Sequence, residues 1–594
     1  MKALGWDYVD IVLFTGDAYI DHPSFGAAVV SRLFEAEGYR VAVVPQPNWR
    51  DDLRDFKKFG APRLCFCVSA GAMDSMVNHY TANIRLRSND AYTAGGAAGF
   101  RPDYTVTTYT KILKNLFPDT PVLIGGIEAS LRRVTHYDYW KNTLMPSILI
   151  DSGADFLLYG MGEQVVREVA ATMRNGFNPK RIRTIRQVAF VADREYVDRL
   201  DKEKTIFLNS FEQCQKDKRA FGQNFVRVET ESNLLNAENV LVEPTADRYV
   251  VINPMNAALT TEQIDYAFDL PYMRAPHPRY NGRGDIPAWM MIRHSVNIHR
   301  GCFGGCAFCT ISAHQGKFIV SRSKESILKE VKAVAQLPDF KGYLSDLGGP
   351  SANMYGMGGK DKALCARCKR PSCIHPKVCP NLNTDHRPLL DIYRAVDSLP
   401  EIKKSFIGSG VRYDLLLHRS DDEAINRAAK EYTHELITRH VSGRLKVAPE
   451  HTSDKVLQVM RKPSFGQFEQ FKRIFDRINR EENLRQQIIP YFISSHPGCT
   501  AEDMAELAVL TKRMDFHLEQ VQDFTPTPMT VSTEAWHTGF HPYTLQPIFS
   551  AKSQRDKLAQ RQFFFWYKPE MRRAIMEELR RMGRRDLIEK LFGR

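Results

Sequence analysis

The sequence lacks any apolar run long enough to cross a lipid bilayer. None of its stretches reaches the roughly 18 consecutive apolar residues that a membrane-spanning helix requires. Its opening segment also lacks the basic region followed by an apolar region that marks a secretory signal. Internal repeats and low-complexity tracts are missing as well. We therefore expect a cytoplasmic protein without a membrane partner.

The composition has no extreme that would indicate disorder. Hydrophobic residues make up 43% and charged residues 25%, which are ordinary values for globular proteins. The 594 residues exceed what one hydrophobic core usually holds, so two or three domains are expected. The net charge of +13 is compatible with an acidic partner such as RNA, but solubility alone explains it equally well.

Residues 1–200 show the pattern of an α/β domain with a parallel sheet. Short apolar runs alternate with amphipathic stretches, and each apolar run ends in small or polar residues. We predict a flavodoxin-like domain. Its strands are predicted at residues 11–15, 40–45, 63–69, 121–125 and 156–159.

The rest of the chain divides into three parts. Residues 201–290 are rich in charge and proline and are interpreted as a connecting region. Residues 291–560 hold a second α/β series, which predicts a complete or partial TIM-type barrel with an inserted segment at 350–386. Residues 561–594 form a basic helical extension, for which a docking helix is the favoured interpretation and an RNA contact the alternative. The barrel strands are predicted at residues 294–299 and near residues 343, 406, 445, 488 and 521.

Cysteines are concentrated in one part of the chain. In a cytoplasmic protein thiols stay reduced, so clustered cysteines are interpreted as metal ligands. Cys302, Cys306 and Cys309 form a C-x3-C-x2-C motif directly after a predicted strand. Three thiolates in one short loop can hold three irons of a 4Fe-4S cluster and leave the fourth iron open. A structural zinc site is the alternative, but zinc usually takes four protein ligands.

The chain resembles the YgiQ-type radical S-adenosylmethionine proteins over nearly its whole length. This resemblance implies a 4Fe-4S cluster on the three cysteines and S-adenosylmethionine bound to the open iron. One electron would then cleave the sulfonium and yield a 5'-deoxyadenosyl radical, which acts on an unidentified substrate. A reductase or a flavodoxin-type electron donor is the implied partner. The resemblance rests on the cysteine motif and on residues 21–26, 124–130, 345–350, 448–452 and 525–530.

A glycine pair after the second barrel strand is the first candidate for the cofactor pocket. Gly348 and Gly349 resemble the Gly-Gly-Glu segment that meets the methionine amino group in radical enzymes, although the glutamate is missing. Their backbone carbonyls could accept hydrogen bonds from an ammonium group, and Asp346 could supply negative charge. An ordinary turn at the end of a strand is the alternative.

Polar residues at the ends of later strands extend this candidate pocket. Ser409 and Arg412 follow one strand, and Glu450 ends the next. Polar groups at the carboxyl ends of barrel strands usually face the active site, so these residues are predicted to bind the cofactor. Phe308 resembles the aromatic position that lies beside adenine.

A second cysteine group has the spacing C-x2-C-x4-C-x5-C. Four cysteines this close together indicate a metal site. A structural zinc ion is the favoured interpretation, an auxiliary iron-sulfur cluster is the main alternative, and His375 or His386 could replace one sulfur. The group consists of Cys365, Cys368, Cys373 and Cys379.

The predicted N-terminal domain resembles the cobalamin-binding domains that precede the barrel in many radical enzymes, but cobalamin is an unlikely cofactor on the sequence alone. The lower-ligand motif of cobalamin domains reads Asp-x-His-x-x-Gly, whereas Asp21 and His22 are adjacent and Gly26 follows too late. His22 is therefore interpreted as a residue at the start of a helix. Gly125 and Gly126 would allow close approach of the ring if cobalamin bound without a histidine ligand.

Two functions of different classes remain open from the sequence. A radical S-adenosylmethionine enzyme is favoured, because a loop that leaves one iron vacant has no use in a binding module. A non-catalytic, metal-stabilised RNA-binding protein is the alternative. Within the enzyme class, residues 493–498 and 524–528 also resemble methylthiotransferases that modify transfer RNA, but their RNA-binding barrel is not recognisable here.

Overall fold

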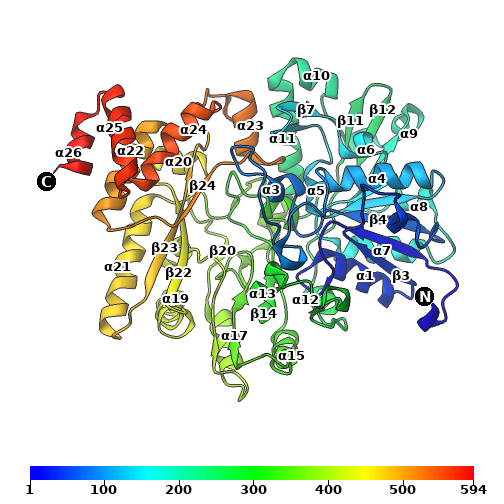
Figure 1. Ribbon diagram of the computed structural model, residues 1–594, viewed down its shortest axis with the longest axis horizontal. Helices are drawn as coiled ribbons and strands as arrows, with labels where there is room; N and C mark the ends of the chain where they lie inside the picture. Colours follow the sequence, from blue (N-terminus) through cyan, green and yellow to red (C-terminus); the bar gives the residue numbers. More distant parts are fainter. Residues whose placement is uncertain (594) are drawn as a thin grey trace.

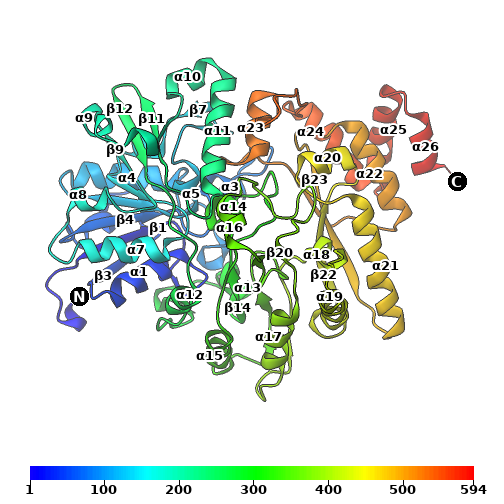
Figure 2. The same cartoon turned by 180° about the vertical axis from the view of Figure 1, so that it is seen from behind.

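The computed structural model describes residues 1–593, which form two α/β halves and a helical C-terminal part (Figure 1). The N-terminal half, from blue to cyan, lies on one side, and the strands of the second half, from green to orange, lie beside it. The view from behind shows the same arrangement (Figure 2). Within the described part of the chain, no helix combines the length and the apolarity needed to cross a membrane.

The N-terminal half contains a sheet of nine strands. Its five parallel strands have the spatial order β3-β1-β4-β5-β8, so the second strand lies outside the first, as in flavodoxin-like sheets. All five overlap the predicted strands, and the flavodoxin-like fold is confirmed. They are β1 (Ile11–Thr15), β3 (Val41–Pro45), β4 (Cys65–Ser69), β5 (Val122–Gly125) and β8 (Phe156–Leu158).

Helices cover both faces of this sheet. Alternate strand residues bury in two separate clusters, one against α4 (Thr105–Leu116) and one against α1 (Gly26–Ala36) and α7 (Gly162–Thr172). Because both faces are buried, the strands are continuously apolar, which made them visible in the sequence.

The region interpreted as a connection belongs to the sheet instead. Residues 205–252 provide three of its strands, and β12 pairs antiparallel with β9 to join them to the parallel strands. The connecting-region interpretation was wrong because these strands lie toward one edge of the sheet and include a buried acid, Glu243, which interrupts the apolar pattern. The strands are β9 (Val188–Ala192), β10 (Thr205–Phe207), β11 (Val240–Thr245) and β12 (Arg248–Ile252).

The second half is a partial barrel of parallel strands with helices outside. β14 pairs with β18, β17 pairs with β21, and β22, β23 and β24 form one parallel sheet. The strands occur where the sequence predicts them. They are β14 (Ser295–Asn297), β17 (Tyr343–Leu344), β18 (Asp346–Gly348), β21 (Lys404–Ser405), β22 (Arg444–Glu450), β23 (Gln487–Ser494) and β24 (Gln520–Asp523).

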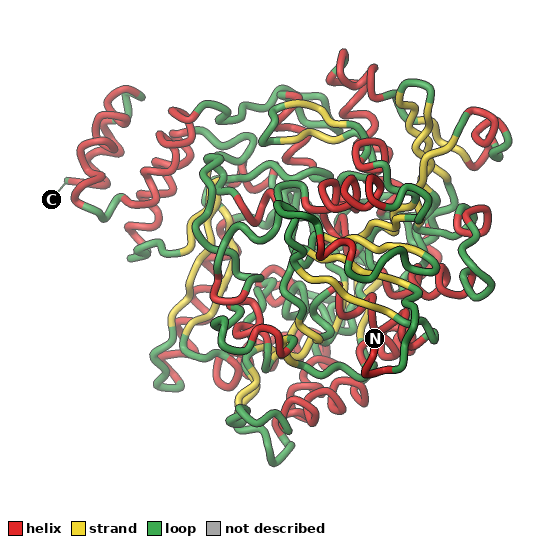
Figure 3. Tube along the Cα trace, turned by 45° about the vertical axis from the view of Figure 1, so that its right-hand side comes forward, coloured by secondary structure: helices red, strands yellow, loops and turns green. Residues whose placement is uncertain are grey.

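The basic C-terminal extension packs on the barrel as a set of short helices. The tube in Figure 3 shows these helices at the end of the molecule away from the N-terminal sheet. α25 (Arg572–Arg581) and α26 (Arg585–Phe592) bury Ile575, Leu579, Leu587 and Leu591 in the core of the second half. These apolar contacts favour the docking interpretation of residues 561–593, and residue 594 lies outside the described residues.

Candidate functional site

The Cys302–Cys309 segment, here called the triad loop, connects β15 (His299–Arg300) to α14 (Ile311–Gln315). Its backbone is fixed from several directions. The amide of Ala307 donates to the carbonyl of Met460 at 2.9 Å, and its carbonyl accepts from the amide of Ser532 at 2.9 Å. The three thiols therefore project from a loop that distant parts of the chain hold in place.

The sulfur atoms of the triad loop surround a space that a side chain would fill. A Cβ added at Gly304 would lie 3.3 Å from Cys302 Sγ, 3.8 Å from Cys306 Sγ and 3.0 Å from Arg412 Nη1. Two sulfurs and a guanidinium thus face one point, and Cys309 is close enough for Cys306 and Cys302 to influence its pKa. This set of donors fits three ligands of an iron-sulfur cluster.

Burial favours the protonated form of two thiols of this loop, Cys302 and Cys309. It raises the pKa of Cys309 to about 12, and it also raises the pKa of Cys302. A metal reverses this preference because it binds the thiolate. Within residues 1–593, no three His, Cys, Asp or Glu side chains already converge as ligands of one ion.

Arg412, predicted to bind the cofactor, contacts the triad itself. Its Nη1 donates to Cys306 Sγ at 3.6 Å, while Nε and Nη2 donate to Asp414 at 2.9 and 2.5 Å. Burial alone would raise the pKa of Asp414, but the adjacent guanidinium holds it below its usual value. Arg412 therefore brings positive charge to Cys306, one of the three predicted cluster ligands, and the sequence did not predict this contact.

The predicted glycine pair lies beside the end of the next strand. Asp346 Oδ2 accepts from Ser409 Oγ at 2.5 Å, and Asp346 Oδ1 accepts from the Ser409 amide at 3.2 Å. A Cβ at Gly348 would come within 2.7 Å of both side chains. The structure thus brings Ser409 to Asp346 and Gly348, from which it lies far away in the sequence.

Glu450 ends another strand of the barrel, and Phe308 belongs to the triad loop itself. Glu450 is buried at the end of β22, and its Oε1 lies 3.5 Å from Lys462 Nζ. Burial raises the pKa of Glu450, and the Lys462 ammonium opposes this shift. Phe308 meets His496 edge to face, with ring centroids 5.9 Å apart. No contact of Phe308 identifies an adenine site by itself.

His299 is a candidate that the sequence analysis missed. It is fully buried, neither of its ring nitrogens has a partner, and its ring occupies the space that a side chain at Gly349 would need. Burial lowers its pKa to about 3, so the ring is neutral. Its position three residues before Cys302 was the available signal, but a lone histidine in a strand usually indicates core packing.

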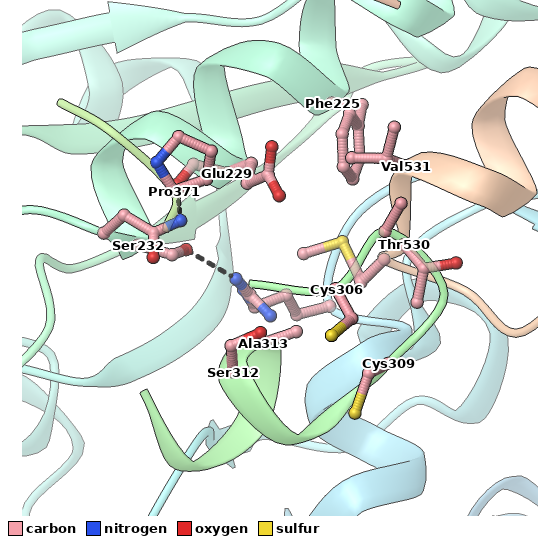
Figure 4. A pocket seen from close by; sticks show the side chains of 14 residues that line it. Phe225, Glu229, Ser232, Cys306, Cys309, Ser312, Ala313, Pro371, Thr530 and Val531 are labelled. Atoms are coloured by element: carbon pink, nitrogen blue, oxygen red, sulfur yellow. Dashed lines mark hydrogen bonds between the residues drawn. The ribbon is translucent and has the colours of Figure 1, made fainter. Parts of the chain in front are cut away.

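A small cavity of about 30 Å³ opens between the triad loop and α11 (Lys218–Ser232). Figure 4 shows Cys306 and Cys309 on one side of it and Ser232 on the other. Arg133 Nη2 donates to Ser232 Oγ at 3.0 Å, and burial lowers the pKa of this arginine. No carboxylate pairs with Arg133 in the described part of the chain. Its positive charge suits an anionic group beside the triad.

A larger cavity of about 350 Å³ lies at the carboxyl edge of the N-terminal parallel strands. Val30, Leu123 and Gly126 line one side, and His314 and Gln315 of α14 line the other. This is the edge at which open α/β sheets bind ligands. Because α14 directly follows Cys309, a ligand here would contact both the N-terminal domain and the segment after the triad loop.

His22, the residue considered as a cobalt ligand, is occupied by protein contacts. Its Nδ1 accepts from the amide of Ser24 at 3.1 Å, and its Nε2 lies 2.8 Å from Arg274 Nη2. Burial and the neighbouring Arg274 lower its pKa well below the usual value. These contacts agree with a structural role at the start of α1.

The four-cysteine group lies against the triad loop. The amide of Cys373 donates to the carbonyl of Phe303 at 3.0 Å, and Ser372 Oγ donates to the carbonyl of Gly304 at 2.8 Å. Burial raises the pKa of Cys373 to about 11, and the ammonium of Lys317 opposes this shift. The sequence did not predict this contact between the two cysteine groups.

Comparisons with known families agree with the resemblance seen in the sequence. The family described as Radical SAM N-terminal matches residues 1–295, and a domain of unknown function (DUF3362) matches residues 519–591. A UPF0313 protein of Bacteroides thetaiotaomicron is 66% identical over 602 residues, covering 99% of this chain and 96% of the relative. A UPF0313 protein of Porphyromonas gingivalis is 62% identical over 594 residues, covering 100% of this chain and 93% of the relative.

The matching solved structures are more distant in sequence. The radical S-adenosylmethionine methyltransferase TsrM from Kitasatospora setae, with cobalamin and a [4Fe-4S] cluster bound, is 13% identical, with a TM-score of 0.48. The match covers 88% of this chain and 74% of TsrM. The cobalamin-dependent S-adenosylmethionine radical enzyme OxsB, with aqua-cobalamin bound, is 10% identical, with a TM-score of 0.48 and coverage of 97% and 62%.

Proposed function

Because the chain belongs to the UPF0313 family of YgiQ-type radical S-adenosylmethionine proteins, we propose that it reductively cleaves S-adenosylmethionine to a 5'-deoxyadenosyl radical. The observation that carries this proposal is the arrangement around Gly304, where two cysteine sulfurs and Arg412 face one space. A 4Fe-4S cluster held there supplies one electron for breaking the carbon-sulfur bond.

The roles of the surrounding residues follow from their positions. Cys302, Cys306 and Cys309 hold the cluster, and Arg412 offsets part of the thiolate charge through Cys306. The carbonyls near Gly348 and the carboxylate of Asp346 are the proposed contacts of the methionine ammonium group.

Arg133 is the proposed contact for an anionic group beside the triad. Its guanidinium is buried, lines the small cavity and has no acidic partner among the described residues. A buried cation gains most from a ligand that neutralises it. The carboxylate of the cofactor or of the target molecule meets that requirement.

The target molecule is proposed to bind in the 350 Å³ cavity at the edge of the N-terminal sheet. Apolar side chains such as Val30 and Leu123 line it on the sheet side, and an apolar wall would limit the access of water to a reactive radical. Filling the cavity with Val30→Trp should lower the rate of cleavage stimulated by the target and leave the slow unstimulated cleavage unchanged. Equal losses in both rates would place the target elsewhere.

The central test is formation of 5'-deoxyadenosine by anaerobically reconstituted protein with dithionite and S-adenosylmethionine. The parent should form it slowly alone and faster with cell extract that contains the target. The triple variant Cys302→Ala, Cys306→Ala, Cys309→Ala should form none, because no side chain replaces the electron source. Cleavage at the parent rate by the triple variant would refute the proposal.

A further inference from the structure

The four-cysteine loop is closed by a short hairpin. β19 (Gly358–Gly359) pairs antiparallel with β20 (Leu382–Asn383), and the four cysteines lie between them. Cys365 is on the short helix α16 (Lys362–Ala366). A turn follows, in which the amide of Cys368 donates a hydrogen bond to the carbonyl of Cys365. The hairpin therefore brings both ends of a cysteine-rich loop to one place.

The surroundings of Cys365 repeat features of the triad loop. A side chain at Gly359 would overlap Cys365 Sγ, as one at Gly304 would crowd Cys302 Sγ. Asn381 Nδ2 donates to Cys365 Sγ at 3.3 Å, much as Arg412 donates to Cys306 Sγ. Hydrogen bonds to sulfur and close backbone approach are both typical of protein-bound iron-sulfur clusters.

A buried cation accompanies the four-cysteine loop. Lys317 is 2% exposed, and its Nζ donates to the carbonyl of Arg370 at 2.8 Å. No carboxylate lies within ion-pair distance of it in the part of the chain that the structure describes. A buried ammonium whose hydrogen-bond acceptor is a neutral carbonyl gains stability from a negative charge nearby. Cysteine thiolates on a metal provide one.

The four cysteines lie in two close pairs. The amide of Cys368 donates to the carbonyl of Cys365 at 3.1 Å, and the amide of Cys379 donates to the carbonyl of Cys373 at 2.8 Å. Four cysteines can hold one zinc ion, or each can bind one iron of a cluster. The close glycine and the hydrogen bond to sulfur that this loop shares with the triad loop favour the cluster.

We propose that Cys365, Cys368, Cys373 and Cys379 bind a second iron-sulfur cluster, with every iron ligated by protein. This assignment replaces the zinc ion that the spacing favours, and it does not depend on the function proposed for the triad loop. The second cluster lies next to the first, because Ser372 Oγ donates a hydrogen bond to the carbonyl of Gly304 and the amide of Cys373 donates one to the carbonyl of Phe303.

The test uses the triple alanine variant of the triad loop, reconstituted anaerobically with iron and sulfide. It should retain about four irons per chain, and the parent should hold about eight. After reduction with dithionite, the retained cluster should give an electron paramagnetic resonance signal that S-adenosylmethionine does not change. A parent with about four irons and one zinc, or a triple variant without iron, would overturn the proposal.

A matched glycine pair tests the site without removing a ligand. Gly359→Ala should lower the iron content by about four irons per chain, the number held by the second cluster, because the new Cβ would overlap Cys365 Sγ. Gly358→Ala is the control, since a Cβ there has no neighbour within 4 Å. Equal iron content in the two variants would contradict the site.

Lys317→Met changes the melting temperature in opposite directions for a loop that carries a metal and a loop that carries none. If the loop carries a negatively charged cluster, removing the cation should lower the melting temperature and speed loss of iron to a chelator. If the loop carries no metal, removing an unpaired buried charge should raise the melting temperature instead. An increase in the reconstituted protein would therefore reject the second cluster.

Discussion

The two cysteine loops differ in the number of thiols and in the source of their positive charge. The triad loop offers three cysteines and is contacted by Arg412, which is itself paired with Asp414. The other loop offers four cysteines and is accompanied by Lys317, which has no acidic partner among the described residues. Three ligands leave one iron free for chemistry, whereas four close the site. The comparison separates a proposed reactive centre from one suited to structure or electron transfer.

The largest expected effect comes from the ion pair at the triad loop. Arg412→Met leaves the buried Asp414 without its partner and should lower the free energy of unfolding by about 3–5 kcal/mol. Urea denaturation of the reconstituted protein measures this loss. Iron should also be lost faster from the triad than from the four-cysteine loop.

The double variant Arg412→Met, Asp414→Asn is the control for this prediction. It removes the unpaired charge and should recover much of the stability, while the contact with Cys306 remains absent. A single variant as stable as the parent would show that the pair does not support the loop.

The next effect tests the space between the two sulfurs of the triad loop. Gly304→Ala places a Cβ 3.3 Å from Cys302 Sγ and should destabilise the loaded protein by up to about 3 kcal/mol. Gly410→Ala is a matched control, because its Cβ would have no neighbour within 4 Å. Iron content and thermal melting of both variants measure the difference, and similar behaviour of the two would mean that the space at Gly304 is not needed.

The sequence predicted best what depends on local pattern. The parallel strands of the N-terminal sheet were visible because both faces are buried, as in β1 (Ile11–Thr15). The strands after residue 200 were missed, since a buried acid such as Glu243 interrupts the apolar pattern of β11 (Val240–Thr245). Tertiary packing against the sheet, and not local propensity, decides that segment.

The candidate site was predictable only in part for a related reason. Cysteine spacing is a local property, so both groups could be found in the sequence. Arg133 and Lys317 could not be recognised as part of the site, because their contacts are with Ser232 and Arg370, which lie far away along the chain. A basic residue in a sequence is usually a surface residue, and only the fold shows that these two are buried without an acid.

A smaller effect concerns acid sensitivity at the triad loop. Burial lowers the pKa of His299 to about 3 from 6.5, so the folded state binds fewer protons than the unfolded state between these values. Stability from this group is present above pH 6.5 and is lost as the pH falls toward 3. At pH 5 the loss should reach about 2 kcal/mol. Between pH 7.5 and pH 5, the free energy of unfolding of His299→Gln should therefore fall by about 2 kcal/mol less than that of the parent, as measured by urea denaturation. An identical pH dependence of the two proteins would contradict the lowered pKa.

The smallest effect concerns the hydrogen bond that joins the two loops. Ser372 Oγ donates to the carbonyl of Gly304 at 2.8 Å and accepts from the amide of His375 at 3.0 Å. Ser372→Ala should lower the free energy of unfolding by about 1 kcal/mol and should speed iron loss from both loops, because each loop loses a contact with the other. Ser398→Ala removes a serine hydroxyl that bonds only to its own helix, at Ala395, and serves as the control. If Ser372→Ala changed only one of the two iron-release rates, the loops would be neighbours without being coupled, and the comparison between them would reduce to their ligand number.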